Sequence, residues 1–242
     1  MMIIDCHVHI GNGERMQDVF QIDCTVARAE YLMKKSGVDK SVIFAVGYEN
    51  YEEPNREIAQ IVRENRQFIG FARLNNEMPN AAEHLKYAVK ELGLVGLKLG
   101  NVPTREILDA VRELKIPVLA HSGMGYPPIQ YEGVVRSYPD ITFILAHLGI
   151  GMSWDTLFSS PLQAFYLAKT YKNVYLDTSA ATWIQYVLEQ AVREVGPDKL
   201  IFGSDGPWFY PAIMRACIKD LDLSDSDEKK IMGENIARIL NL

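Results

Sequence analysis

The sequence opens with Met1-Met2-Ile3-Ile4-Asp5-Cys6-His7-Val8-His9, in which an apolar run leads directly into two histidines spaced two residues apart. The apolar run predicts a buried strand over residues 2–9. Side chains two apart on a strand point to the same face, so both imidazoles are expected to face one pocket. Imidazole is a common ligand of zinc and related divalent metals. The stretch therefore predicts a metal-binding strand end, although an HxH pair alone occurs by chance in many chains.

The rest of the chain repeats the pattern of an apolar strand followed by a helix. Seven further strands are expected, at residues 39–47, 67–74, 94–99, 116–121, 141–147, 173–178 and 199–205. Helical spacing of apolar residues occurs between them, at residues 25–36, 54–65, 80–92, 104–114, 153–170, 183–194 and 211–220, with a shorter element at 129–138 and a last helix at 225–241. Ser36-Gly37 is typical of a helix end, and Thr104 behind Pro103 is typical of a helix start.

Eight strands that alternate with helices predict a protein of the α/β class. Because 242 residues contain no long linker or low-complexity run, we expect a single-domain (β/α)8 TIM barrel over residues 1–242. An open doubly wound sheet is the alternative, but its glycine-rich GxGxxG turn is missing after the first strand. Residues 10–24 form a longer connection than usual, and we expect them to cover the barrel mouth as part of a lid.

Composition narrows the classes of partner and compartment. The net charge is −6, from 25 basic and 31 acidic residues, and no basic cluster is present, so no nucleic-acid partner is expected. No apolar run reaches the roughly 18 residues of a membrane span. Cys6, Cys24 and Cys217 are scattered and form no disulfide framework, and no signal peptide is recognisable. These features predict a reducing, cytoplasmic location.

Polar residues that carry chemistry end several of the predicted strands, where a barrel has its active site. Four of the five histidines lie at such ends, and only His84 falls in a predicted helix. The strand-end residues are His7, His9, Lys98, His121, His147 and Asp205. Each one alone is more often a hydrogen-bonded structural group. Together they would destabilise the fold unless a metal or a mutual network satisfied them, so a metal site is predicted.

The order and spacing of these motifs resemble the amidohydrolase superfamily. DxHxH on the first strand, one histidine on each of the fifth and sixth strands, and Gly203-Ser204-Asp205 on the eighth are similar to its "amidohydrolase 2" branch of metal-dependent hydrolases and decarboxylases. The resemblance covers the whole chain, including the closing segment 232–240. It implies one divalent metal per chain, zinc before other metals, and a homodimer. The implied metal ligands are His7, His9, His121 and Asp205.

The resemblance also implies roles for the remaining residues. Asp205 is expected to act as general base as well as ligand, and His147 to polarise the substrate or move a proton. In other branches a lysine like Lys98 is carboxylated and bridges two metals; here a single metal is favoured, and Lys98 is expected to contact a substrate anion. Trp208, in the aromatic segment 206–211, is expected to bind substrate.

Two functions follow from this set of residues. A bound divalent metal with an open position lowers the pKa of water to about 7 and polarises a carbonyl. The first prediction is therefore a hydrolase that acts on a small amide, lactone or ester through a metal-activated water. The alternative is a non-oxidative decarboxylase of a small aromatic or unsaturated acid, and the short loops favour the hydrolase. A barrel that has lost its activity is a third interpretation, which the intact ligand set argues against.

The strand alternation also predicts how the first motif divides its side chains. Asp5 is two residues before His7, so it is expected to share the histidine face and to orient the site rather than bind the ion. Cys6 and Val8 are expected to face the helices.

Overall fold

The computed structural model describes residues 1–11, 20–157, 159–181 and 185–242. All recorded strand pairs among these residues are parallel, in a three-stranded sheet with the order β1-β2-β3 and a six-stranded sheet with the order β4-β5-β6-β7-β8-β9. The strands are β1 (Ile4–Ile10), β2 (Lys40–Ala45), β3 (Phe68–Gly70), β4 (Ala72–Leu74), β5 (Leu97–Leu99), β6 (Val118–Ala120), β7 (Phe143–Leu145), β8 (Val174–Asp177) and β9 (Leu200–Ile201).

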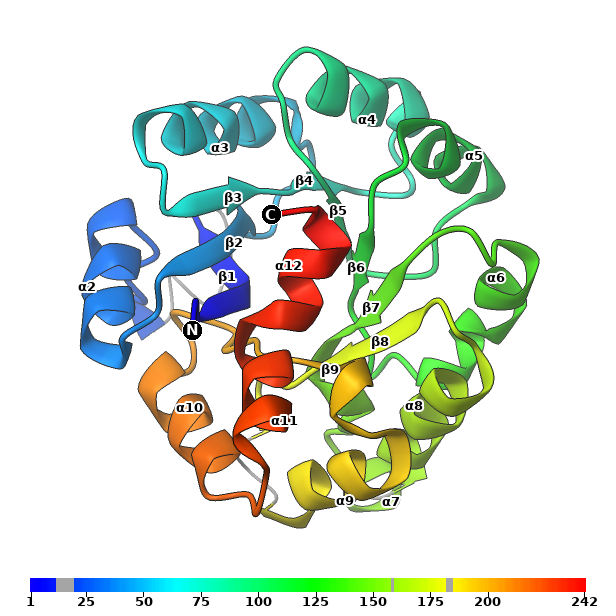
Figure 1. Cartoon of the computed structure of the whole chain (residues 1–242). Helices are drawn as coiled ribbons and strands as arrows, with labels where there is room; N and C mark the ends of the chain where they lie inside the picture. The colour runs from blue at the N-terminus through cyan, green and yellow to red at the C-terminus, as the bar shows by residue number, and fades with distance from the viewer. Residues whose placement is uncertain (12–19, 158, 182–184) are drawn as a thin grey trace.

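Helices connect the strands and form the outer layer of the molecule (Figure 1). They are α2 (Val26–Ser36), α3 (Glu52–Glu64), α4 (Ala81–Lys90), α5 (Arg105–Leu114), α6 (Glu132–Ser137), α7 (Trp154–Leu157), α8 (Ser159–Thr170), α9 (Gln185–Val195), α10 (Pro211–Lys219), α11 (Asp225–Lys229) and α12 (Asn235–Leu240). Helix α12 lies across one end of the ring of strands in Figure 1. None of the described helices is both long and apolar enough to cross a membrane.

Backbone hydrogen bonds join the two sheets at both of their free edges. β3 and β4 are separated only by Phe71, whose N–H donates to the Ile43 carbonyl at 2.9 Å, and the N–H of Ala72 donates to the Gly96 carbonyl at 2.8 Å. At the other edge, the Cys6 N–H donates to the Phe202 carbonyl at 2.9 Å. The predicted α/β class and (β/α)8 TIM-barrel arrangement are confirmed, with the strand expected at 67–74 divided because it changes partner at Phe71.

Two hydrophobic clusters fill the two layers of the fold. The larger cluster contains residues of both the strands and the surrounding helices. In the smaller, inner cluster, strand residues that alternate with those of the larger cluster meet Ile236 of α12. The inner cluster contains Ile4, Cys6, Val42, Phe44, Ile69, Phe71, Leu119, Ile144, Ala146, Ile201 and Ile236. Parallel strands that are buried on both faces require apolar residues at nearly every position, which explains the continuous apolar runs of the sequence.

The prediction that Cys6 faces the helices is wrong. The register of β1 against β2 shifts between Asp5 and Val8, which marks a β-bulge. A bulge inserts one residue and reverses the alternation beyond it. Cys6 therefore packs in the inner cluster, while Asp5 lines a small cavity beside Leu32 of α2. Val8 packs in the outer cluster, as expected.

Several predicted boundaries match the structure. The Thr104 side chain caps α5 by accepting from the Ile107 N–H, and Gly37 ends α2 with a φ of 65°. The last helix is the main difference, because a π-helical turn at Lys230–Glu234 separates α11 from α12. A Cβ on Gly233 would clash with the Met2 carbonyl oxygen, so the turn packs directly on the chain before β1. Residues 12–19 of the expected lid lie outside the described residues.

Candidate metal centre

The structure brings the predicted strand-end residues to one end of the barrel. His7 and His9 project from β1, His121 and His147 follow β6 and β7, and Asp205 follows β9. His147 and Asp205 adopt left-handed backbone conformations, with φ values of 61° and 64°. Such conformations are strained for residues other than glycine and cluster at functional sites. The surrounding structure therefore holds His147 and Asp205 in backbone conformations that are unfavourable on their own.

His7, His9 and Asp205 form a group that could hold a metal ion. Oδ1 of Asp205 lies 3.3 Å from His7 Nε2 and 3.1 Å from His9 Nε2. The side chains of all three are nearly or fully buried. The two imidazole centroids are 5.3 Å apart, so both rings face the same carboxylate, as the spacing on the strand predicts.

The donor set of this group fits a divalent cation. His7 Nε2 is buried and has no hydrogen-bond partner, while His7 Nδ1 lies 2.9 Å from Oδ2 of Asp177. A neutral ring that carries its proton on Nδ1 presents a bare lone pair at Nε2. That lone pair would face the carboxylate of Asp205, and two buried acceptors facing each other are destabilising. A cation bound between them removes this repulsion, and two imidazoles with one carboxylate suit zinc or a related metal.

His121 and His147 form a second pair beside this group. His147 Nε2 lies 3.2 Å from His121 Nδ1, and the His147 ring is 5.0 Å from the His7 ring between centroids. His121 does not belong to the tight three-residue groups found among the described residues. Its role as a ligand stays a prediction, as do the roles assigned to His147.

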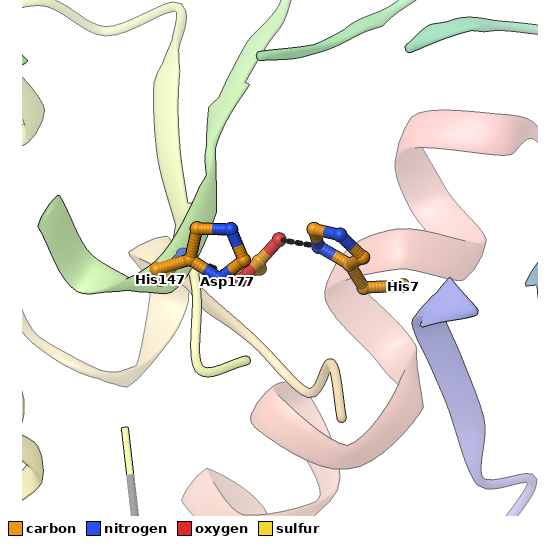
Figure 2. A group of neighbouring side chains, drawn as sticks. All are labelled: His7, His147 and Asp177. Carbon is orange, nitrogen blue, oxygen red and sulfur yellow. Dashed lines mark hydrogen bonds and ion pairs between the residues drawn. The ribbon is translucent and has the colours of Figure 1, made fainter. Parts of the chain in front are cut away.

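Asp177 is a central residue of the site that the sequence reasoning missed. It ends β8, is fully buried, and lies between the rings of His7 and His147 (Figure 2). Its Oδ1 also accepts from the backbone N–H groups of His147 and Ser179, each at 2.9 Å. Asp177 stands at the end of the strand expected over 173–178, so the same reading of strand ends that selected His121 could have found it.

Asp5 acts on the backbone of the site rather than on the metal group. Its Oδ1 accepts from the N–H groups of His7 at 3.1 Å and Ser204 at 2.9 Å, and its Oδ2 accepts from the Ser204 hydroxyl at 2.5 Å. Burial raises the pKa of Asp5 to about 7, although the hydrogen bonds from Ser204 oppose the rise. Asp5 thus connects β1 to the segment after β9. It does so from the face of β1 towards α2, and not from the histidine face on which it was predicted.

Lys98 is buried beneath the site rather than exposed in its mouth. Its Nζ has no hydrogen-bond partner and lies 5.5 Å from the centroid of the Phe44 ring. Burial and, to a smaller extent, the charge of Arg73 lower the pKa of Lys98 to about 8. Lys98 is absent from the described residues that line the large cavity. Its contact with a substrate anion stays a prediction.

An open cavity of about 610 Å³ lies in front of the metal-binding group. Its described lining consists of His9, Phe20, Ile22, Arg73, His121, Met124, His147, Met152, Asp205, Trp208 and Phe209. Trp208 packs edge-on against His9, with ring centroids 4.4 Å apart, so the predicted substrate-binding residue does reach the cavity. Arg73, which the sequence reasoning missed, supplies a cation to a wall that is otherwise mostly apolar.

The buried histidines predict that acid destabilises the metal-free protein. Burial lowers the pKa of His147 to about 4, against the opposing attraction of Asp205. Since an unfolded histidine titrates near 6.5, the unfolded state binds the extra proton first as pH falls. Stability is therefore expected to decrease from about pH 6.5 towards pH 4. Urea unfolding at pH 7.5, 6 and 5 measures this, and His147→Gln should give a shallower dependence. If the free energy of unfolding fell equally with pH in both proteins, His147 would not be the group responsible.

Comparison with protein families decides the relationship of the chain. The amidohydrolase model, Amidohydro_2, matches residues 4–242. The chain belongs to the amidohydrolase family. The resemblance stated from the sequence motifs is thus confirmed, and the protein is a metal-dependent enzyme of this family.

Known amidohydrolase relatives extend this comparison. A gamma-resorcylate decarboxylase from Polaromonas sp. strain JS666 is 23% identical, over 76% of this chain and 73% of the relative. The crystal structure of a 2,6-dihydroxybenzoate decarboxylase with 2,6-dihydroxybenzoate has a TM-score of 0.79 at 16% identity, with full coverage of both chains. A dihydroxybenzoic acid decarboxylase from Polaromonas sp. JS666, with bound manganese and 2-nitroresorcinol, has a TM-score of 0.78 at 19% identity, covering 100% of this chain and 97% of the other.

These relatives bear on the two predicted functions. All three are named as decarboxylases, one of gamma-resorcylate and two of dihydroxybenzoic acids. They favour the decarboxylase alternative over the hydrolase that the short loops suggested. One of them binds manganese, so a divalent metal in this family fold is supported, whereas zinc is not specifically shown.

Proposed function

We propose that this amidohydrolase-family enzyme is a metal-dependent, non-oxidative decarboxylase of a small aromatic carboxylic acid. The observation that carries the proposal is the cavity, in which aromatic and aliphatic side chains surround the metal-binding group and Arg73. Apolar walls with a few convergent polar groups are typical of a site for a small, partly apolar ligand. The decarboxylase relatives support the same chemistry.

His7, His9, His121 and Asp205 would hold one divalent metal, zinc or manganese. When bound, the metal supplies a positive charge that binds and polarises the carboxylate and a neighbouring oxygen of the substrate. Trp208 and Phe209 line the cavity wall against which the aromatic ring of the substrate would pack.

The chain's own residues account for the proton balance. The reaction breaks the bond between the ring carbon and the carboxylate carbon, releases carbon dioxide and places one proton on the ring carbon. Against the effect of burial, the neighbouring imidazoles of His7 and His9 hold the pKa of Asp205 well below its usual range. The ionised Asp205 is placed to take one proton from solvent and to pass it to the ring carbon. This proton balances the loss of carbon dioxide from the substrate carboxylate. His147 lies on the cavity wall. Its proposed role, to polarise the substrate or to move a proton, requires its Nε2 to exchange His121 for a substrate oxygen as hydrogen-bond partner.

The decarboxylase is tested with the protein loaded with zinc or manganese. Incubation with 2,6-dihydroxybenzoate is expected to release carbon dioxide and resorcinol, and the same reaction in D₂O should place one deuterium on the ring. A panel of lactones, amides and esters runs in parallel. Acid release from that panel, without carbon dioxide from any hydroxybenzoate, would establish the hydrolase instead.

Arg73 is expected to bind the negatively charged substrate. A charge-assisted hydrogen bond to a carboxylate contributes about 1.5–3 kcal/mol, so Arg73→Met should raise KM for the acid roughly 10- to 100-fold, with a smaller effect on kcat. Inhibition by the uncharged product provides the control, because it should change little. An unaltered KM for the acid would show that Arg73 does not contact the carboxylate.

The remaining partner assignments are proposals of the same kind. A small-molecule substrate, no nucleic acid, no membrane and a homodimer are expected. Size-exclusion chromatography with light scattering measures the oligomeric state.

A further inference from the structure

Asp177 lies behind the pocket histidines and has no part in the proposed proton transfer. Its Oδ2 is 2.9 Å from His7 Nδ1, and the carboxylate lies between two imidazole rings in Figure 2. Its other oxygen, Oδ1, accepts from the backbone N–H groups of His147 and Ser179, each at 2.9 Å, so the surrounding donors favour the ionised carboxylate. An ionised carboxylate can only accept hydrogen bonds. Nδ1 of His7 therefore carries a proton.

Ser179 links Asp177 to His147 and determines which nitrogen of His147 is the donor. The Ser179 hydroxyl contacts Oδ1 of Asp177 and lies 2.8 Å from His147 Nδ1. A hydroxyl has one hydrogen, and Asp177 can only receive it. The oxygen of Ser179 must then accept from His147, so Nδ1 of His147 carries a proton as well. The same oxygen lies 3.1 Å from His7 Nδ1. The hydrogen on His7 Nδ1 is therefore shared between Asp177 and Ser179.

His147 in turn determines which nitrogen of His121 is the donor. A neutral imidazole has one N–H, so Nε2 of His147 is an acceptor. It lies 3.2 Å from His121 Nδ1, which must be the donor. The only nitrogen left without a proton on a neutral His121 is Nε2. The chain of donors and acceptors thus ends at a lone pair that can bind a metal.

We propose that Asp177 and Ser179 form a positioning relay that fixes which ring nitrogen carries the proton on three pocket histidines. These histidines are His7, His147 and His121. The relay leaves Nε2 of His7 and Nε2 of His121 as lone pairs for a metal. Neither Asp177 nor Ser179 lines the cavity among its described residues, so both are positioning residues and act through the rings.

His9 lies outside the relay and provides an internal comparison. Its Nδ1 is buried without a hydrogen-bond partner, and its Nε2 faces Asp205 at 3.1 Å. The relay rests on the metal site of the proposed function but not on the substrate. A readout on the imidazole protons therefore separates the two ideas.

The test measures histidine tautomers in the full-length protein labelled with ¹⁵N-histidine. Two-bond ¹H–¹⁵N correlation spectra are recorded after removal of metal with a chelator and again after loading with zinc. In the metal-free wild type, all three relay rings are expected to be protonated at Nδ1. Ser179→Ala should leave His7 unchanged and convert His147 and His121 to tautomer mixtures. Asp177→Asn should change all three rings.

Thr178→Val is the matched control. The Thr178 hydroxyl is as buried as that of Ser179 but hydrogen-bonds the backbone of Gly203, at 3.1 and 3.2 Å. Its removal should leave all tautomers as in the wild type. Outer partners of ligating histidines typically contribute 10- to 100-fold in metal affinity, so Asp177→Asn should weaken zinc binding by this factor in a chelator competition, and Thr178→Val should not.

Two results would overturn the relay. One is a wild-type protein in which His7 or His121 carries its proton on Nε2 before metal is added. The other is a Thr178→Val variant that shifts tautomers as Ser179→Ala does, which would indicate a general effect of packing. A protein with the expected tautomers and no decarboxylase activity would refute only the proposed function.

Discussion

Asp205→Asn is expected to remove nearly all decarboxylase activity, with kcat falling by a factor of about 10²–10⁴. Two effects act in the same direction. The amide lacks the negative charge that faces His7 Nε2 and His9 Nε2 at 3.3 and 3.1 Å, so metal affinity decreases. An amide also cannot carry the proton to the ring carbon. Carbon dioxide release measures the activity, and metal analysis after dialysis measures occupancy.

The control for this substitution is Asp39→Asn, the same chemical change near the opposite end of β1. Asp39 is exposed and accepts from the backbone N–H of Ile3 at 2.7 Å. We expect it to leave metal content and kcat unchanged. If Asp205→Asn kept both full occupancy and wild-type kcat, the assignment of Asp205 would be wrong.

Lys98→Met is expected to stabilise the fold by about 3 kcal/mol at pH 7. Burial lowers the pKa of Lys98 to about 8, whereas an unfolded lysine titrates near 10.4. As pH falls from about 10.4 to about 8, the unfolded state binds the proton first, so the free energy of unfolding of the wild type decreases. Below about pH 8 both states are protonated, and the decrease stays constant. Methionine fills similar space without a charge. The gain should therefore be largest near pH 7 and shrink towards pH 10.5.

Lys199→Met is the matched control and should have the opposite sign. Lys199 Nζ donates to three backbone carbonyls, those of Tyr171, Lys172 and Val174, at 3.2, 2.6 and 2.9 Å. Removing these hydrogen bonds leaves acceptors unpaired and destabilises the protein. Urea unfolding of both variants between pH 7 and pH 10.5 gives the comparison. If Lys98→Met were less stable than the wild type at pH 7, the prediction would be wrong, and the buried ammonium would have a stabilising partner such as a bound anion.

Much of the fold could be predicted because its signals are local. The apolar runs at 39–47 and 141–147 and the cap at Thr104 are determined by neighbours in the sequence, and the structure places a strand or helix at each. The division at Phe71 could not be predicted in this way, because it depends on which strands lie on either side of it.

The site was predictable to the extent that function collects at strand ends. His7, His9 and Asp205 were selected by position and do lie together. Asp177 stands at an equivalent position and was passed over, because an isolated aspartate after a strand carries no motif. Arg73 was missed because the end of its predicted strand, 67–74, carries no residue of a metal-binding type.

By itself, the sequence determined the α/β class, the order of the elements and the candidate ligands, because hydrophobic periodicity and motif spacing are local properties. Only the tertiary structure decided which side chains meet. A bulge in β1 moved Asp5 and Cys6 to the opposite faces from those expected. The hydrogen bond between Asp177 and His7 joins residues 170 positions apart. Such contacts depend on the closing of strands around a common axis, which no local pattern records.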